Sequence, residues 1–222
     1  MYHLIYLVYQ FARFNSKRQE KIASFANIVS MLMNLSYGNH PMKHFAIPIL
    51  CEFAHSTKKC RSLLLNDNGI DYFLRLLQDS FWSVNSLESI VALMKDDKKQ
   101  TELNFCKPGK QEILASFVSA CKADEKILIP IRRLMQESKQ LTSFLNRTDV
   151  VKHFISFLNH PSPIIRLNSL QIINMLLLSV NNYTLFDEVY NLSKTLIEIL
   201  VEEKAVLVAD LAENILTTLT VK

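Results

Sequence analysis

Apolar residues recur at helical spacing along most of the chain. In four segments, residues 69–79, 110–120, 149–160 and 191–203, a large apolar residue is followed by another four positions later. Residues four apart lie on one side of an α-helix, so each segment is predicted to be a helix with one buried face. The second apolar residues of these pairs, at 77, 118, 158 and 200, follow one another in steps of 41, 40 and 42 residues.

A second series of helical segments keeps the same step. Its aligned leucines, Leu87, Leu128, Leu170 and Leu211, are 41, 42 and 41 residues apart. Two of these segments repeat the phrase Asn-Ser-Leu, at 85–87 and at 168–170. Two explanations compete: a duplicated half of an active site, or equivalent helices of a repeat array. A helical period of 40–42 residues is typical of armadillo and HEAT repeats and favours the second explanation.

The chain is therefore predicted to be all-α, an armadillo/HEAT-like right-handed helical solenoid of about four to five repeats. The repeats are expected over residues 41–222. Residues 1–40 match the period less well and are predicted to be an N-terminal helical cap or a partial repeat, with one helix in 3–14 and one in 21–35. The side chains predicted to be buried are Phe73, Leu77, Leu87, Ile90, Leu114, Phe154, Leu158, Leu170, Ile173, Leu196, Leu200 and Leu211.

Residues that favour helix ends refine these boundaries. Ser162-Pro163 is predicted to be the N-cap and first residue of one long helix, and Asp79-Ser80 is predicted to start another. Gly69 is expected at the left-handed position that follows a short helix. Pro130 lies inside a helical pattern, so that helix is predicted either to kink there or to begin there.

Composition supports a helical protein and narrows its class. The chain is 49% hydrophobic with three glycines and six prolines, too few turn residues for an all-β fold. A net charge of +4 is far below that of a dedicated nucleic-acid binder, so no nucleic-acid partner is expected. The first apolar run is much shorter than the roughly 20 residues that span a membrane, and no membrane partner is expected. The four cysteines form no Cys-x-x-Cys pair and are predicted to be free, buried thiols of a cytoplasmic protein.

The sequence offers no catalytic motif. Its three glycines are scattered singly, which rules out a phosphate-binding loop, and neither Gly-x-Ser-x-Gly nor a His-Arg-Asp loop occurs. His40 with His44, and Cys51 with His55, have the spacing of two metal ligands on one helix, but two ligands do not make a site. We therefore predict a protein without enzymatic activity, without a metal and without a cofactor.

Several stretches together resemble the non-catalytic armadillo region of one kinase group, the plant mitogen-activated protein kinase kinase kinase epsilon and the fungal septation-initiation and mitotic-exit network kinases. The resemblance runs from about Ala46 to Leu219. Residues 1–40 lie outside it, and the loop 106–111 departs from it. Its most specific pieces are Ala46–Cys51, His55, Gly69, Asp71, Trp82–Ser83, Leu87, Ser89–Ile90 and Arg166–Asn168.

The resemblance implies a regulatory region in a longer chain whose Ser/Thr kinase domain lies elsewhere. It also implies docking to a Ras-like small GTPase and to a scaffold protein at the spindle pole body. A structural module that forms homo-oligomers or an autoinhibitory contact is the alternative. A third reading, peptide binding of the nuclear-import type, requires a ladder of asparagines. The corresponding positions here are Cys51, Ala92, Arg133, Met175 and Thr217, so that reading is disfavoured.

A partner site is expected on the inner wall of the solenoid. In each helix of the second series, the residue two before the aligned leucine, the one after it and the one five after it share one face. That face is unusually polar for a core and becomes basic around Lys126 and Arg133, which suits an acidic loop of a partner. The predicted partner-binding residues are Asn85, Glu88, Lys126, Arg132, Arg133, Arg166, Asn168 and Gln171.

Overall fold

The computed structural model describes residues 2–38, 40–95, 98–105, 107, 109–180 and 183–220. Every regular element in these ranges is a helix, which confirms the all-α prediction. The chain divides into two compact units, residues 1–110 and residues 111–222, and each is described by itself.

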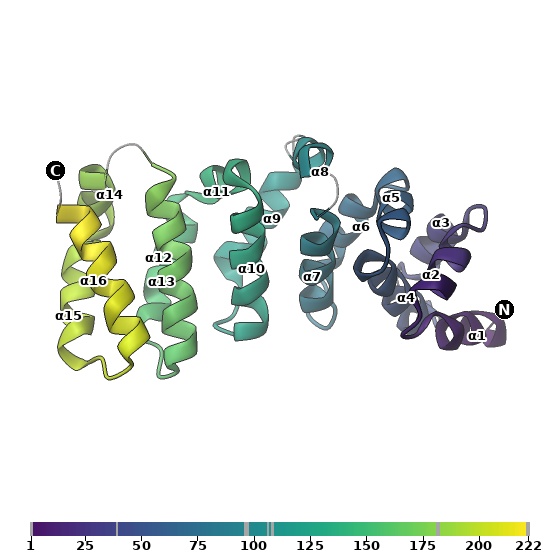
Figure 1. The fold of residues 1–222 in the computed structure, drawn as a ribbon, viewed down its shortest axis with the longest axis horizontal. Coiled ribbons are helices and arrows are strands. Elements are labelled where there is room, and N and C mark those ends of the chain that lie inside the picture. Colours follow the sequence, from purple (N-terminus) through teal and green to yellow (C-terminus); the bar gives the residue numbers. More distant parts are fainter. Residues whose placement is uncertain are drawn as a thin grey trace. The chain divides into compact units, whose positions relative to one another are not determined.

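Unit 1 contains eight described helices, and six of them form two sequential groups of three, α2 to α4 and α5 to α7 (Figure 1). Within it α2, α3 and α4 contact one another, α6 packs on both α5 and α7, and α1 packs on α2 and α4. The last helices of the two groups, α4 and α7, also lie against each other. The bounds are α1 Tyr2–Ala12, α2 Ser16–Ala23, α3 Ile28–Leu35, α4 Lys43–His55, α5 Lys58–Asn66, α6 Gly69–Leu76, α7 Ser83–Leu93 and α8 Lys98–Phe105.

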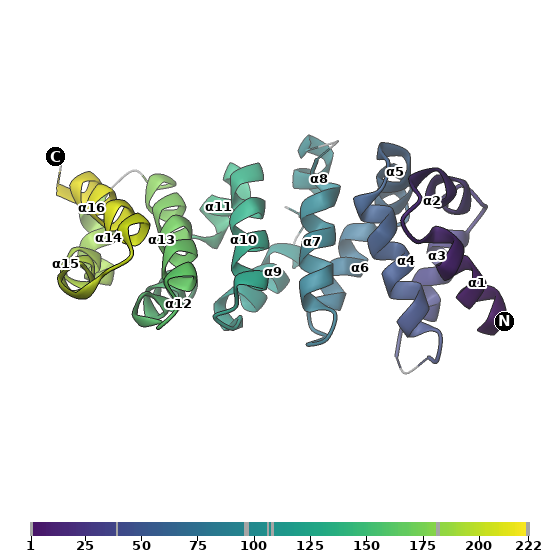
Figure 2. The ribbon, with the colours of Figure 1, turned by 60° about the horizontal axis from the view of Figure 1, so that its bottom comes forward.

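Unit 2 repeats the arrangement. Two groups of three, α11 to α13 and α14 to α16, are each packed together, and α13 lies between α10 and α16 in both views (Figures 1 and 2). The helix α9 begins at the last residue of unit 1. The bounds are α9 Lys110–Ala120, α10 Glu125–Glu137, α11 Lys139–Leu145, α12 Thr148–Ser156, the 3₁₀ turn η1 Phe157–Asn159, α13 Pro163–Leu178, α14 Tyr183–Tyr190, α15 Leu192–Glu202 and α16 Val206–Thr220.

Ten of the twelve side chains predicted to be buried are buried, including Phe154 and Leu170, which are fully inaccessible. The prediction was wrong for Leu200 and Leu211, which are half-buried. These two leucines lie on α15 and α16, where the described helices of unit 2 pack against one flank only. The periodicity therefore identified the inward face correctly but could not show how fully each helix is covered.

The predicted N-terminal helix over 21–35 was wrong as a single element. The helix is interrupted between Ala23, where α2 ends, and Ile28, where α3 begins. Asn27, just before α3, has a left-handed backbone with φ 62°. The helix α3 then packs on α4 much as α6 packs on α7. The boundary between residues 40 and 41 stays a prediction.

The helix ends show one confirmation and two corrections. Ser162 is the N-cap and Pro163 the first residue of α13, as predicted. The start at Asp79-Ser80 was wrong, because a turn continues to Trp82 and α7 begins at Ser83. Pro130 does not begin its helix but lies within α10, at the sixth position.

Gly69 was assigned the wrong role. The left-handed position after α5 belongs to Asn68, with φ 61°, and Gly69 is the first residue of α6. A Cβ at Gly69 would lie 2.7 Å from the carbonyl oxygen of Leu64, well inside van der Waals contact. The glycine is needed because two helices approach closely here, and the left-handed turn itself is met by asparagine.

Candidate functional site

The predicted inner-wall residues of unit 2 lie on α10 and α13, which pack side by side. Lys126 and Arg133 are exposed on α10, seven residues apart and therefore on one face. Ile129 lies between them and is half-buried. Two positively charged side chains thus flank an apolar one on an accessible helix surface.

Across the helix pair, Arg132 of α10 donates a hydrogen bond from Nη1 to Oε1 of Gln171 on α13. Both side chains are half-buried. This contact brings together two residues that are 39 positions apart in the sequence and that were both predicted for the site. Gln171 is therefore held in place, with Met175 half-buried one turn further along α13.

Asn168, another predicted contact, bonds within its own helix. Its side chain is buried, and Nδ2 donates to the carbonyl oxygen of Ile164, one turn earlier in α13, at 2.8 Å. In unit 1, the predicted residues Asn85 and Glu88 lie on α7, where Asn85 is exposed and Glu88 is half-buried. In unit 1 the predicted residues on α7 are thus accessible, and in unit 2 those on α10 are more accessible than those on α13.

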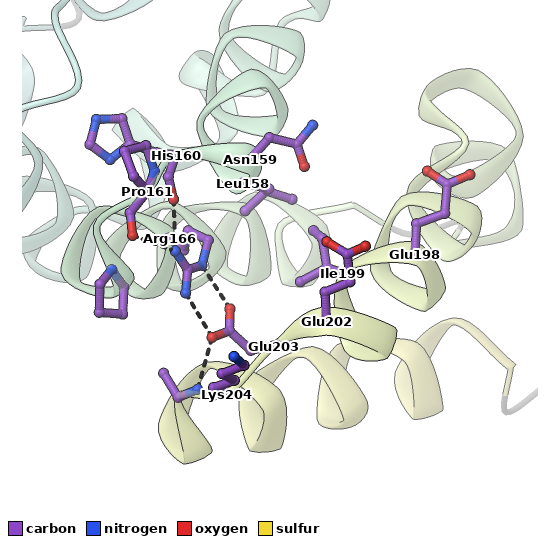
Figure 3. Close-up of a pocket in the computed structure, with 12 residues that line it drawn as sticks. Leu158, Asn159, His160, Pro161, Arg166, Glu198, Ile199, Glu202, Glu203 and Lys204 are labelled. Atoms are coloured by element: carbon purple, nitrogen blue, oxygen red, sulfur yellow. Dashed lines mark hydrogen bonds and ion pairs between the residues drawn. The ribbon is translucent and has the colours of Figure 1, made fainter.

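Arg166 is committed to a contact inside unit 2. Its Nε donates to Oε2 of Glu203 and its Nη2 donates to Oε1, both at 2.7 Å, and Nη1 donates to the carbonyl oxygens of His160 and Pro161 (Figure 3). The Glu203 side chain is 2% exposed. The arginine holds the pKa of this carboxyl below its usual range by hydrogen bonding to the ionised form.

This ion pair lines a cleft of about 800 Å³ between the turn before α13 and the end of α15. In Figure 3, Arg166 and Glu203 point toward each other, with His160 and Pro161 on one side. Exposed Glu198 and Glu202 lie on the α15 side of the cleft. Exposed Lys204 also lines the cleft, so the exposed charged side chains around it are two acids and one lysine, an arrangement that periodicity alone did not suggest.

A similar pair occurs in unit 1. Lys43, the first residue of α4, donates from Nζ to Oδ2 of Asp79 at 2.6 Å. The hydrogen bond from Lys43 holds the pKa of Asp79 below its usual range. The two pairs are placed alike. In unit 1 the cation lies at the start of α4 and the acid in the turn before α7. In unit 2 the cation lies near the start of α13 and the acid in the turn before α16.

The acids in these pairs belong to a wider pattern. Before each of α4, α7, α10, α13 and α16, one side chain accepts a hydrogen bond from the backbone N–H two residues later, as in Asx-type turns. The lengths run from 2.9 to 3.1 Å. The acceptors are His40, Asp79, Asp124, His160 and Glu203. In the sequence, these turns could have been recognised from the polar residue that stands shortly before each helix of the second series.

The cysteine and metal expectations concern other residues. Cys51, Cys60 and Cys121 are free and buried, as predicted, and burial raises the pKa of Cys51 to about 11 and that of Cys121 to about 12. Cys106 lies outside the described residues. Over the described ranges, no three or more His, Cys, Asp or Glu side chains gather closely enough to hold a metal ion. In those same ranges no helix is long and apolar enough to span a membrane.

Comparison with known proteins confirms the resemblance. The chain is 32% identical over 174 residues to cytokinesis protein sepH of Aspergillus terreus and 31% identical over 183 residues to MAP3K epsilon protein kinase 1 of Arabidopsis thaliana, matches that cover 75% and 77% of the chain. It is 24% identical over 200 residues to cell division control protein 7 of Schizosaccharomyces pombe, covering 85% of the chain. These matches span only 13%, 13% and 19% of the respective relatives.

Solved structures confirm the armadillo-like fold. A designed armadillo repeat protein matches 97% of this chain and 92% of its own with a TM-score of 0.71 at 14% identity. A computationally designed armadillo repeat protein for modular peptide recognition matches 96% and 90% with a TM-score of 0.73 at 13% identity. At such identities the likeness shows the fold alone. No family model matches the chain.

Proposed function

We propose that this chain is a non-catalytic, protein-binding regulatory region of a cell-division signalling kinase. The observation that carries the proposal is the similarity of 75–94% of the chain to a short part of proteins named for cytokinesis, cell division and MAP3K epsilon kinase activity. The armadillo-like fold supports a binding role, because stacked helical repeats present extended surfaces to partners. In this proposal the Ser/Thr kinase domain lies elsewhere in the parent protein.

The proposed partners are a Ras-like small GTPase and a scaffold protein, which would recruit the parent kinase from the cytoplasm to the spindle pole body. The proposed contact surface in unit 2 is the α10 and α13 face, comprising Lys126, Ile129, Arg133, Gln171 and Met175. Exposed cations around a half-buried apolar residue suit a partner loop that carries acidic and apolar side chains. Asn85 and Glu88 are the corresponding proposed contacts in unit 1.

The test is capture of a Ras-like GTPase of the septation or mitotic-exit type by the immobilised chain. The GTPase is offered once loaded with GDP and once with a non-hydrolysable GTP analogue, and capture is quantified by binding isotherms. We expect the GTP-analogue form to bind at least about tenfold more tightly, a difference of about 1.4 kcal/mol. Binding of neither form would contradict GTPase docking, and equal binding of both would contradict its dependence on the bound nucleotide.

The scaffold arm of the proposal is tested separately. A spindle pole scaffold fragment is offered to the chain with and without the GTPase, so that direct and bridged capture are distinguished. Capture of the scaffold alone, with no capture of GTPase in either state, would retain the regulatory module and remove the GTPase. Capture of neither would favour the purely structural alternative.

A further inference from the structure

Charge is distributed unevenly between the two ends of the sequence. Residues 1–50 contain five lysine and arginine residues and one glutamate, a net charge of +4. Residues 183–220 contain seven aspartate and glutamate residues and two lysines, a net charge of −5. The first helices of unit 1 and the last helices of unit 2 therefore carry opposite charge.

The helix α1 leaves an apolar stripe uncovered. It buries Ile5 and Ala12 against unit 1, each 1% exposed, and so packs through one face only. Its other face and the residues just after it carry Leu4, Leu7, Phe11 and Phe14, which are 61%, 50%, 58% and 84% exposed. Their spacing of three, four and three residues is that of the seam along which two helices pack in a coiled coil.

Positive charges border this stripe. The guanidinium of Arg13 lies 4.9 Å from the ring centroid of Phe14, and that of Arg18 lies 5.9 Å from the centroid of Phe11. Lys17 and Lys21 are exposed nearby on α2. The one glutamate of this part of the chain, Glu20, lies 3.6 Å from Lys59. The surface is thus apolar along its middle and basic at its edge, and we call it the α1 face.

The helices α15 and α16 leave a second apolar surface uncovered, the α15–α16 face. They turn Leu196 and Val208 inward, which are 0% and 1% exposed. On their outer sides Ile197, Val201, Val206 and Leu207 are 53%, 81%, 70% and 68% exposed. The exposed acids Glu198, Glu202, Asp210 and Glu213 are interleaved with these residues. Exposed Lys194, 4.0 Å from Glu198, and exposed Lys204 lie on the same part of the chain, so these four acids outnumber the lysines and the surface is apolar with a net negative charge.

We propose that the chain binds a second copy of itself head to tail, with the α1 face of one copy seated on the α15–α16 face of the next. Each contact pairs an apolar stripe with an apolar stripe and a basic edge with an acidic one, which is favourable in both respects. Pairing of two α1 faces would place arginines against arginines, and pairing of two α15–α16 faces would place glutamates against glutamates. Charge therefore selects the unlike pair.

Such a contact resembles the packing between neighbouring groups of helices within each unit. In a helical repeat protein every group buries its apolar faces against its neighbours, so the uncovered apolar face of one group can pack against that of another. A contact between two different faces of identical chains leaves one face of each kind free in a dimer. Head-to-tail pairing therefore adds copies in a row rather than stopping at two, unless the row closes into a ring.

The first measurement is sedimentation velocity of the unaltered chain across a concentration series. We expect the weight-average mass to rise with concentration. We also expect the rise to weaken when salt is raised from about 50 mM to about 500 mM, because the charged edges are exposed and screened. A chain that stays monomeric at every concentration in low salt overturns the proposal.

The second measurement separates head-to-tail pairing from other modes of association. One variant carries Leu7→Glu and Phe11→Glu and loses the α1 face; the other carries Val201→Gln and Val206→Gln and loses the α15–α16 face, so the two altered faces do not attract each other by charge. Each alone should associate at least about tenfold more weakly than the unaltered chain, as expected when central interface side chains are lost. An equimolar mixture should form a one-to-one dimer and nothing larger, because one intact face of each kind remains.

The matched control reverses two exposed lysines of unit 2 that lie in neither face, Lys122→Glu and Lys152→Glu. It should associate like the unaltered chain, and thermal melts should show that all variants stay folded. If either interface variant associates as strongly as the control, or if the mixture remains monomeric, head-to-tail pairing is wrong. Capture of a GTPase is measured independently, so failure of one proposal leaves the other standing.

Discussion

Arg166 and Glu203 form a two-pronged ion pair that joins the start of α13 to the turn before α16, with both N–O distances at 2.7 Å. Glu203 also accepts the Ala205 N–H at 2.9 Å, so one carboxylate both shapes its own turn and receives the neighbouring helix. Lys43 and Asp79 stand in the same relationship in unit 1, where Asp79 accepts the Phe81 N–H at 3.0 Å. The two partners are 37 residues apart in the sequence in the first pair and 36 residues apart in the second.

Replacing Arg166 should destabilise the chain. The Arg166→Ala variant leaves the nearly inaccessible Glu203 carboxylate without its cation and removes the hydrogen bonds to two carbonyl oxygens, and we expect a loss of about 1–3 kcal/mol in the free energy of unfolding. Urea denaturation measures it. The matched control is Arg147→Ala, which removes the exposed ion pair with Glu112 and should leave the midpoint unchanged. Equal effects of the two variants would refute a structural role for the Arg166 pair.

The same carboxylates should make stability depend on pH in the acid range. The pKa values of Glu203 and Asp79 are lowered in the folded chain, so the unfolded chain takes up their protons first as the pH falls. Their contribution is complete above the ordinary carboxyl pKa of about 4 and is lost as the pH falls below it toward their folded values. A variant with Glu203→Gln and Asp79→Asn should be less stable at pH 7 and lose less stability between pH 5 and pH 3. An unchanged acid slope in urea titrations would show that other groups govern it.

Core truncation should distinguish fully covered from half-covered positions. Phe154→Ala and Leu170→Ala each remove a fully buried side chain and should cost roughly 2–5 kcal/mol, the sum of lost transfer energy and a cavity. Leu200→Ala and Leu211→Ala remove half-buried side chains and should cost less than about 2 kcal/mol, since part of their surface is already in water. Thermal and urea unfolding measure all four. Equal costs in both classes would place α15 and α16 against further structure.

The turn between α5 and α6 should tolerate glycine at one position and reject alanine at the next. Asn68→Gly keeps the left-handed backbone accessible and should change stability by no more than about 1 kcal/mol. Gly69→Ala forces a Cβ to 2.7 Å from the Leu64 carbonyl oxygen and should cost about 1–3 kcal/mol through displacement of α6. The reverse ranking in urea denaturation would restore the left-handed role to Gly69.

Charge reversal on α10 should weaken partner binding without unfolding the chain. The double variant Lys126→Glu and Arg133→Glu changes two exposed side chains, so its stability should stay within about 0.5 kcal/mol per site. Affinity for the GTPase should fall at least about tenfold, because a basic edge becomes acidic. The charge-matched control is Lys122→Glu with Lys152→Glu, which should bind normally. Unaltered binding by the α10 variant would move the partner site to another surface.

The sequence by itself determined the helical fold and most of the core. Its apolar residues recur at i and i+4 within segments and at 40–42 residues between them, and both periods arise from local backbone geometry and repeated stacking. Leu87 and Leu170 could therefore be placed inside before any contact was known. The same local reasoning located the exposed Lys126 and Arg133 on one helix face.

Only the tertiary structure decided what each polar residue does. Arg166 and Lys126 were both predicted to contact a partner, yet Arg166 is bound by a glutamate 37 residues away and Lys126 is exposed. Gly69 is required by the approach of Leu64, which no propensity for turns reveals. Leu200 and Leu211 repeat the core pattern but meet helices on one flank only. A period specifies which face of a helix turns inward, whereas burial and pairing depend on which atoms the neighbouring helices bring to that face.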